Sequence, residues 1–385
     1  MPTRLATTTF WASAAGLAFA HAGYPLALRL LPRRPLAVPA VGPHDEDLPT
    51  VSLVVAAYAE QDVIAAKVAD ALAQDYPRAL LQVVVACDGS PDATPQRARK
   101  AGADLVLELP RGGKIAAQDA AVARSCGEIV AFSDANARWD PQAMRRLVAP
   151  FADPQVAYVC GQVVFAHADG AQGTNQEGVY WRYEMWLRAA ESERWSVTAG
   201  NGAIYATRRE DYAVVDPVMG HDLMFPFTLV RGGRRAVYAP DAQAMEKMVP
   251  SIEGEWRRKR RMMCHAWAII LRGGLLDPRG LPPAYVLMLL GHRWLRYASP
   301  FLHLALLAAT VRLNAGHPAR VRPVHRLALA GQSALLAAAI AGPRAGRVGL
   351  IARYYTLTTA SIAAGLHDHL RYGTAAGWDA PQGTR

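Results

Sequence analysis

The segment from residue 51 to 134 alternates short apolar runs with stretches whose apolar residues have helical spacing. The apolar runs are VSLVVAAY (51–58), LQVVVACD (81–88), DLVLEL (104–109) and EIVAFSD (128–134). Continuous apolar runs of this length are typical of strands that are buried on both faces. Because the segments between them are too long for hairpins, the pattern predicts a parallel sheet with helices on both faces.

Three of these predicted strands end in polar side chains. Tyr58, Asp88 and Asp134 each stand at the carboxyl end of a strand. Open α/β sheets bind ligands outside the carboxyl ends of their strands, so we expect these side chains to border one site. The pair Asp140-Pro141 instead predicts a helix start, with Asp140 as a structural N-cap.

A metal site is one interpretation of Asp134 and Asn136. Two oxygen-bearing side chains two residues apart suit a hard divalent cation, although Asp and Asn are also common in turns. Lys114 follows two glycines, as in a phosphate-binding loop, but Ile115 departs from the P-loop pattern. Lys114 is therefore either a nucleotide contact or a solvated lysine at a helix start.

The composition points to a basic protein with apolar flanks. The formal net charge is +10 and the sequence pI is about 9.6, which suits a membrane surface or anionic substrates. No low-complexity arm rich in lysine and arginine is present, so we expect no nucleic-acid partner. The 4 cysteines form no CxxC pair, which agrees with a reducing compartment.

The N-terminal segment 8–31 is apolar and holds one charge, Arg29, near its end. About 20 apolar residues are enough to cross a bilayer. A cleaved signal peptide is the alternative, but its n-region would carry only Arg4 and the apolar stretch continues past Ala22. Arginines after the segment predict that the chain from residue 34 onward is cytoplasmic.

Further apolar stretches follow residue 272. Residues 276–298 predict an interfacial amphipathic helix, since histidine, arginines and aromatics lie among leucines. We expect four membrane spans in all, or three, with arginines on both sides that leave the number open. The predicted divisions are 1–34 (anchor), 35–50 (linker), 51–272 (catalytic domain), 273–372 (interfacial helix and C-terminal spans) and 373–385 (tail).

Six segments in order resemble the family 2 glycosyltransferases of the GT-A fold, in particular the membrane-anchored members akin to cellulose and hyaluronan synthases. The segments are VVAAYAE (54–60), CDGSPDAT (87–94), RGGKIAAQDAA (111–121), FSDANA (132–137), AGNGAIYATRRE (199–210) and GHDLMFPFTLVRGGRRAVYAPDA (220–242). The resemblance implies a Rossmann-like mixed sheet with helices on both faces, flanked by transmembrane helices. It also implies a multi-pass protein of the cell (inner) membrane with a cytoplasmic catalytic domain.

The resemblance implies a role for each matching residue. Asp222 is implied as the general base, and Asp134 and Asn136 as the metal pair that holds Mg2+ or Mn2+ on the donor diphosphate. The nucleotide-binding residues implied are Ala57, Tyr58, Glu60, Asp88 and Lys114. The expected reaction moves a sugar from a nucleoside diphosphate, with UDP as the expected nucleotide, to a lipid-linked or polysaccharide acceptor. A direct attack would invert the anomeric centre.

Several of these residues have structural alternatives. Asp88 could be a turn residue, and Asp222 could cap a helix over 223–232. Gly200 and Asn201 either form a tight turn or shape the donor-sugar pocket. The aromatics between 180 and 195 either stack on sugar or pack in a core.

The sequence also departs from the family. His221 stands where an acid often precedes the base, and Ala56 and Ala59 replace a frequent Pro and Asn. The QxxRW motif of processive synthases is missing, because Arg258 and Met262 stand at its Gln and Trp positions while Arg261 keeps the Arg. Arg258 and Arg261 are weaker candidates for acceptor or diphosphate contacts, the alternative being a solvated face or a lipid-headgroup contact.

Two rival functions remain from sequence alone. A sugar-nucleotide pyrophosphorylase would also have a nucleotide-binding α/β sheet, but its apolar flanks would be unexplained. A catalytically degenerate glycosyltransferase that acts as a scaffold or binds polysaccharide would account for the replaced motif residues.

Overall fold

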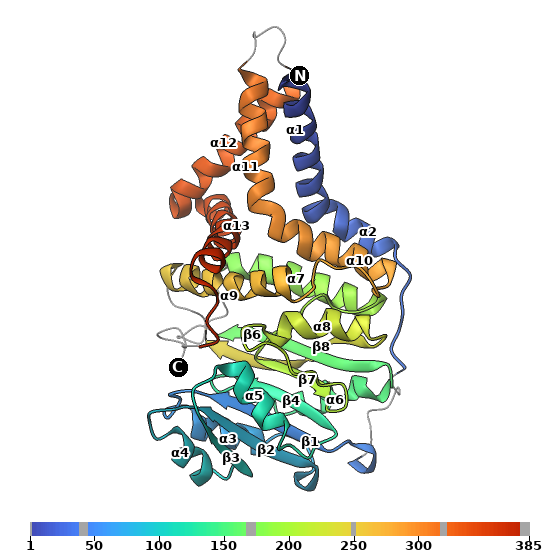
Figure 1. Cartoon of the computed structure of the whole chain (residues 1–385), viewed down its shortest axis with the longest axis vertical. Helices are drawn as coiled ribbons and strands as arrows, with labels where there is room; N and C mark the ends of the chain where they lie inside the picture. The colour runs from blue at the N-terminus through green and yellow to red at the C-terminus, as the bar shows by residue number, and fades with distance from the viewer. Residues whose placement is uncertain (1, 38–44, 167–174, 248–251, 316–321, 378–385) are drawn as a thin grey trace.

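A computed structural model describes residues 2–37, 45–166, 175–247, 252–315 and 322–377. Figure 1 shows a sheet at one end of the molecule and a group of helices that projects from the other end. Helices α7, α8 and α9 lie between these two parts.

The first half of the sheet has the predicted parallel arrangement. Strand β2 pairs with β1 and β3, and β1 also pairs with β4, all in parallel. Every residue of β1 is buried, which agrees with its apolar sequence. The strands are β1 (Val51–Ala57), β2 (Leu81–Asp88), β3 (Leu105–Leu109) and β4 (Ile129–Asp134), and the helices between them are α3 (Ile64–Leu72), α4 (Thr94–Lys100) and α5 (Lys114–Val122).

The second half makes the sheet mixed. The order of its 8 strands is β3-β2-β1-β4-β7-β6-β8-β5, and β7 runs antiparallel to both neighbours. Phe132 of β4 stacks on its cross-strand partner Tyr205 of β7, with ring centroids 4.6 Å apart. The elements are β5 (Arg138–Trp139), α6 (Ala143–Val148), β6 (Val156–Ala166), α7 (Asn175–Arg194), β7 (Ile204–Arg208), α8 (His221–Arg231), β8 (Arg235–Lys247) and α9 (Ile252–Arg272).

The reversed strand has a direct consequence for the site. Ile204, the first residue of β7, pairs with Ser133 near the end of β4. The loop that precedes β7 therefore lies at the same sheet edge as Asp134. The predicted N-cap at Asp140 is wrong, because α6 begins after Gln142 and has no side-chain cap. The Asp140 carboxylate instead accepts a hydrogen bond from the Gln142 backbone N–H at 3.0 Å, in the turn before the helix.

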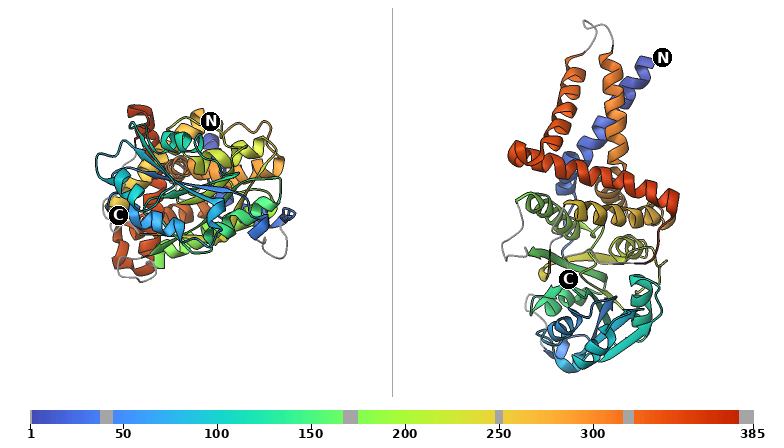
Figure 2. Two further views of the ribbon diagram at one scale, coloured as in Figure 1. Left: turned by 90° about the horizontal axis from the view of Figure 1, so that it is seen from below. Right: turned by 90° about the vertical axis from the view of Figure 1, so that its left-hand side faces the viewer.

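The remaining helices form the projecting part. Figure 2 shows α13 running across the ends of α11 and α12, and α13 packs along α9. Tyr24 and Leu28 are fully buried, so the N-terminal segment packs into the rest of the chain. These elements are α1 (Pro2–Ala18), the π-helix η1 (Phe19–Gly23), α2 (Tyr24–Leu30), α10 (Pro283–Leu289), the π-helix η5 (Leu290–Trp294), α11 (Leu295–Asn314), α12 (Pro323–Ala341) and α13 (Gly346–Tyr372).

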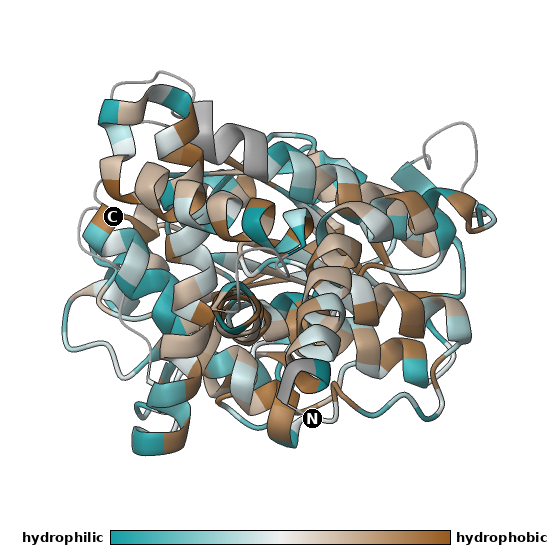
Figure 3. Ribbon diagram, turned by 90° about the horizontal axis from the view of Figure 1, so that it is seen from above, coloured by the Kyte–Doolittle hydropathy of each residue, from teal (hydrophilic) through white to brown (hydrophobic). Residues whose placement is uncertain are grey.

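One helical stretch among the described residues, Pro323–Tyr372, is long and apolar enough to cross a membrane by length and composition. The N-terminal helix α1 does not meet this criterion. Of the four spans predicted from sequence, the structure therefore supports one possible C-terminal stretch, and the multi-pass arrangement stays a prediction. Figure 3 views this end from above and shows brown, apolar residues along its helices.

Candidate functional site

The register of the sheet brings the predicted strand ends together. Ala56 of β1 pairs with Asp134, and Ala57 pairs with Cys87, which precedes Asp88. Tyr58, Asp88 and Asp134 therefore border one edge of the sheet, as the sequence predicts.

Asp88 holds the loop formed by residues 111–114. Its carboxylate accepts hydrogen bonds from the backbone N–H groups of Gly112 at 2.6 Å and Gly113 at 3.0 Å. The guanidinium of Arg111 lies 3.2 Å from the same carboxylate. With its side chain only 5% exposed, Asp88 fixes this loop more than it faces solvent. A nucleobase N–H that donates to Asp88, as the resemblance implies, has to do so beside these contacts.

Arg111 is a residue of this site that the sequence interpretation missed. Its guanidinium carbon lies 3.2 Å from the ring centroid of Tyr58, in a cation–π contact. Tyr58 is half-buried, whereas its neighbours Ala57 and Glu60 are buried. The signal that could have found Arg111 is its position directly before Gly112-Gly113.

Lys114 connects two loops of the sheet edge. Its ammonium group forms an ion pair with Asp134 and donates to the carbonyl oxygen of Gly202 at 3.3 Å. Both charged side chains are about one-fifth exposed, at 20% and 18%. Lys114 is thus part of the site and differs from a solvated lysine.

The Asp134 region fits a divalent cation in part. Asp134 and Asn136 are half-buried and offer oxygen ligands, and Asp134 already holds a cationic group in Lys114. The described residues contain no group of three or more His, Cys, Asp or Glu side chains suited to a metal. Mg2+ is commonly bound by one or two carboxylates plus substrate phosphates, so the residues fit a cation whose other ligands come from a diphosphate.

Asp222 lies in the first turn of α8, close to the same edge. Its backbone carbonyl accepts a hydrogen bond from Gly200 N–H at 2.7 Å. The helix begins after Gly220 without a side-chain cap, so the N-cap alternative for Asp222 is not supported by a bond. Among the described residues, the Asp222 carboxylate forms no hydrogen bond or ion pair. Loop 200–202 thus contacts Asp222 at one end and Lys114 at the other.

His221 is a core residue. Its side chain is 2% exposed, and Nδ1 lies 2.9 Å from the hydroxyl of Tyr205. Burial, followed by the charge of Lys114, lowers the pKa of His221 to about 3. The imidazole is therefore neutral at physiological pH and replaces the family's acid with an uncharged group.

Gly200 and Asn201 form the turn that precedes β7. The Asn201 side chain donates to Gly161 O at 2.7 Å and accepts from the backbone N–H groups of Ala203 and Ile204. A methyl group at Gly200 would overlap the hydroxyl of Tyr158, so only glycine fits here. The tight-turn alternative therefore accounts for both residues.

Basic and acidic groups also approach from β8 and α9. Arg258 binds Glu255 through two hydrogen bonds of 2.8 and 2.9 Å, and Arg261 is half-buried on the same helix. Burial, followed by the charge of Asp134, raises the pKa of Glu246 to about 7. Glu246, which sequence reasoning missed, therefore lies within electrostatic reach of the predicted metal pair.

The aromatic residues of α7 are explained by packing. Trp181 Nε1 donates to Val163 O at 3.1 Å, and Tyr183 donates to His21 O at 3.3 Å. Trp195 lies under the guanidinium of Arg34, with 4.4 Å to the ring centroid. The side chain of Tyr180, a further stacking candidate, lies outside the described residues.

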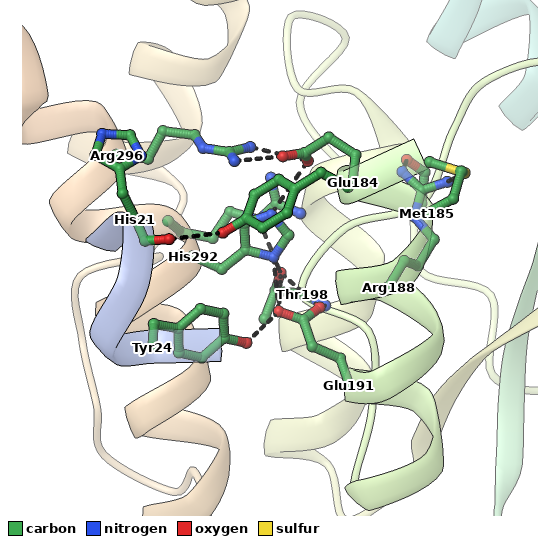
Figure 4. A network of polar contacts seen from close by, with 12 residues as sticks. His21, Tyr24, Glu184, Met185, Arg188, Glu191, Thr198, His292 and Arg296 are labelled. Atoms are coloured by element: carbon green, nitrogen blue, oxygen red, sulfur yellow. Dashed lines mark hydrogen bonds and ion pairs between the residues drawn. The ribbon is translucent and has the colours of Figure 1, made fainter. Parts of the chain in front are cut away.

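A second polar cluster lies deeper, between α7, α2 and η5 (Figure 4). His292 binds Glu191 at 2.6 Å and Glu184 at 3.2 Å, and Arg296 pairs with Glu184. Tyr24 donates to Glu191 at 2.5 Å. Burial alone would raise the pKa of Glu184, but the charges of Arg296 and His292 hold it well below its usual range. His292, predicted at a membrane interface, thus has protein partners.

The comparisons with known proteins agree with the site. Residues 52–214 match the family described as Glycosyl transferase family 2. The structure superposes on the mannosyltransferase PcManGT from Pyrobaculum calidifontis with a TM-score of 0.71 and 25% identity, covering 96% of this chain and 99% of that one. That structure contains GDP-Man and Mn2+.

Two sequence relatives are glycosyltransferases. The chain is 27% identical to glycosyltransferase AglE of Haloferax volcanii over 143 residues, 36% of this chain and 47% of the relative. It is 26% identical to an N-acetylglucosaminyltransferase of Rhizobium sp. (strain N33) over 247 residues, 58% of this chain and 55% of the relative. The chain spans about half the length of the curated relatives that it matches.

The mixed sheet thus has the GT-A fold, as its superposition on PcManGT shows. Residues 52–214 carry the match to family 2 glycosyltransferases, so this family assignment is made for that region of the chain. The match favours a glycosyltransferase over the pyrophosphorylase alternative.

Proposed function

We propose that the protein is a membrane-bound, metal-dependent, inverting glycosyltransferase with Asp222 as its general base. The donor is a UDP-sugar, and the acceptor is lipid-linked or a polysaccharide. The observation that carries the proposal is the common loop 200–202, which contacts Lys114 beside Asp134 and also the backbone of Asp222. The cation at Asp134 that would balance the donor's charge and the carboxylate at Asp222 that would accept the acceptor's proton therefore both lie beside loop 200–202.

The residues of the site have different roles in the proposed reaction. A divalent cation bound at Asp134 and Asn136 would supply Lewis-acid stabilisation of the departing diphosphate. Lys114, and Arg258 more weakly, add positive charge around the same group. The Asp222 carboxylate takes the proton from the acceptor hydroxyl as that oxygen attacks the anomeric carbon, and the diphosphate leaves with the bonding electrons.

The identity of the donor's nucleobase is a separate part of the proposal. UDP follows from the resemblance, whereas PcManGT holds GDP-Man. The planar contact of Arg111 with Tyr58, beside Asp88, marks where a nucleobase would stack and hydrogen-bond. When the nucleotide binds, Arg111 must either contact the nucleobase as well or move away from the ring of Tyr58.

A lipid-linked acceptor is supported by a groove between α9 and α13. It is shallow and open to solvent, with a volume of about 410 Å³, and its lining on α9 ends at Arg257, the residue before Arg258. Apolar side chains and two arginines suit an isoprenoid or acyl chain that carries an anionic group. The lining residues are Ile252, Glu253, Trp256, Arg257, Arg353 and Leu357.

Membrane insertion is supported by the projecting helices. Helices α1, α11 and α12 run together, and large apolar side chains are exposed along them (Figure 2). Such a surface is unusual for a protein in water. Because α13 lies across these helices, we place α13 at the membrane interface. The exposed residues include Leu5, Trp11, Phe301, Leu304, Leu327 and Ile340.

The test is a donor screen with membranes that contain the protein, Mg2+ or Mn2+, and labelled UDP-glucose, UDP-N-acetylglucosamine or GDP-mannose. We expect UDP release, and a loss of about 10²–10⁴-fold in kcat for Asp222→Asn. The matched control is Asp241→Asn, which changes an exposed acid of β8 and should leave kcat intact.

Each outcome of the screen has a distinct meaning. Release of GDP alone would refute the UDP assignment, and full activity of Asp222→Asn would refute the base. A product that retains the donor's anomeric configuration by NMR would refute direct inversion. No turnover with any donor would favour the degenerate scaffold, which the replaced residues Asn136 and Met262 motivate.

A further inference from the structure

The C-terminal segment 373–377 lies between α9 and loop 111–114. Figure 1 shows this red segment descending from α13, past α9, toward the level of the sheet. The segment contains only small residues, with the sequence GTAAG. Its backbone can therefore approach other backbone closely.

The start of this segment is firmly held. Helix α13 is fixed to α9 by the Arg260–Asp368 pair, with two contacts of 2.5 and 2.6 Å, and by the Trp267 Nε1 hydrogen bond to Ile362 O at 2.8 Å. Gly373, with a φ of 73°, then ends α13. A chain that leaves such an anchor has a defined direction.

Thr374 fixes the segment to α9. Its hydroxyl lies 2.7 Å from His369 Nδ1 and 3.3 Å from Cys264 O, to which it donates. The Cys264 thiol lies 3.2 Å from the same hydroxyl. Thr374 and Ala376 are half-buried while Ala375 is exposed, so one face of the segment is turned toward the protein.

The other end of the segment rests on loop 111–114. A methyl group at Gly113 would overlap the carbonyl oxygen of Ala376, so the two backbones are in direct contact. Gly113 has a φ of 94° and its N–H binds the Asp88 carboxylate. The next residue, Lys114, pairs with Asp134.

We infer that segment 373–377 braces loop 111–114 and thereby sets the affinity for the donor nucleotide; this rests on the proposed function. The brace holds the Gly113 N–H on Asp88 and Lys114 beside Asp134 before the donor arrives. The segment continues from α13 and is bound to α9. It therefore also links loop 111–114, on the donor side of the site, to the helices on the acceptor side. Ala376 and Thr374 are positioning residues, since they act through the loop.

The test compares Ala376→Leu with the exposed neighbour Ala375→Leu in the full-length protein. A leucine at 376 would collide with Gly113 and lift the segment, whereas a leucine at 375 points away. For Ala376→Leu we expect faster hydrogen–deuterium exchange of the backbone amides of loop 111–114. We also expect about tenfold weaker UDP binding and a higher donor KM at unchanged kcat, because the loop must then be ordered on binding.

Thr374 gives a second, independent variant. Thr374→Val removes the hydroxyl contacts at nearly constant volume and should change exchange and UDP binding in the same direction. Thr374→Ser keeps the hydroxyl and should restore both.

Unchanged exchange in Ala376→Leu would overturn the brace, and equal or tighter UDP binding by that variant would overturn its role in donor affinity. Failure of the native protein to bind UDP or GDP would instead refute the proposed function. The exchange result would then still show whether segment 373–377 holds loop 111–114 in place.

Discussion

Two polar clusters in the described part of the chain have opposite character. At the sheet edge, Lys114 and Asp134 are about one-fifth exposed, and the Asp222 carboxylate forms no bond with described residues. In the second cluster, His292 and Glu191 are 3% and 1% exposed, and each binds several partners. The deep cluster has satisfied its charges within the protein, whereas the edge cluster keeps charge available for a ligand.

Stability should depend most on the deep cluster. Glu191→Gln removes one charge from a buried pair, which typically costs about 3–5 kcal/mol of unfolding free energy. The change should lower the thermal unfolding midpoint strongly, as circular dichroism would measure.

Glu193→Gln is the matched control on the same helix. Glu193 is 54% exposed and its ion-pair contacts are 3.5 and 3.6 Å long, so the expected cost is below about 1 kcal/mol. Equal unfolding midpoints for the two variants would remove the distinction between the clusters.

Turnover should depend most on the edge cluster. Asp134→Asn should reduce kcat by at least roughly a hundredfold, because it removes the carboxylate ligand of the cation that would stabilise the leaving diphosphate. Its unfolding midpoint should change little, since the partner Lys114 can reach solvent. Chelation with EDTA should abolish native turnover and add nothing to the loss in Asp134→Asn.

Asp140→Ala is the control within the same stretch of sequence. It removes the hydrogen bond that the Asp140 carboxylate accepts from the Gln142 backbone, which costs about 1 kcal/mol of stability, and should leave kcat intact. A loss of turnover as large as that of Asp134→Asn would show that the whole stretch acts structurally.

At neutral pH the smallest expected effect is that of His221, because its contribution to stability changes only under acidic conditions. Its pKa is lowered from 6.5 to about 3 in the folded state, so the unfolded chain binds the extra proton between these values. Stability should therefore fall as the pH drops from about 6.5 toward 3, by up to about 1.4 kcal/mol per pH unit.

His221→Gln should show a shallower loss of unfolding midpoint over this window. His367→Gln, a change at a side chain that is 61% exposed, should follow the native curve. Coincident curves for His221→Gln and the native protein would mean that folding does not lower the pKa of His221.

The sequence predicts the first half of the sheet well because its signal is local. Apolar runs without alternation mark β1, β2 and β4, and the residue at each strand end then falls at the common edge. The helix expected over 223–232 occupies His221–Arg231. The positions of Asp88 and Asp134 at that edge thus follow from the sequence pattern alone.

Residues whose role depends on distant partners could not be derived in this way. The mixed neighbours of His292 predict a membrane interface, but its partners lie on α7, about a hundred residues earlier. The burial of His221 depends on tyrosines from β7 and the loop that follows it. The contact of Ala376 with Gly113 joins opposite parts of the sequence, which no periodicity reveals.

Because β7 runs antiparallel to β4, the position of loop 200–202 at the sheet edge does not depend on how many residues lie between the two strands. Because β7 starts where β4 ends, residues 135–199 leave this place and return to it. Insertions within that excursion could lengthen its surface connections without moving Asp134 away from loop 200–202. New acceptor-binding surface can thus be added here while the donor site keeps its shape.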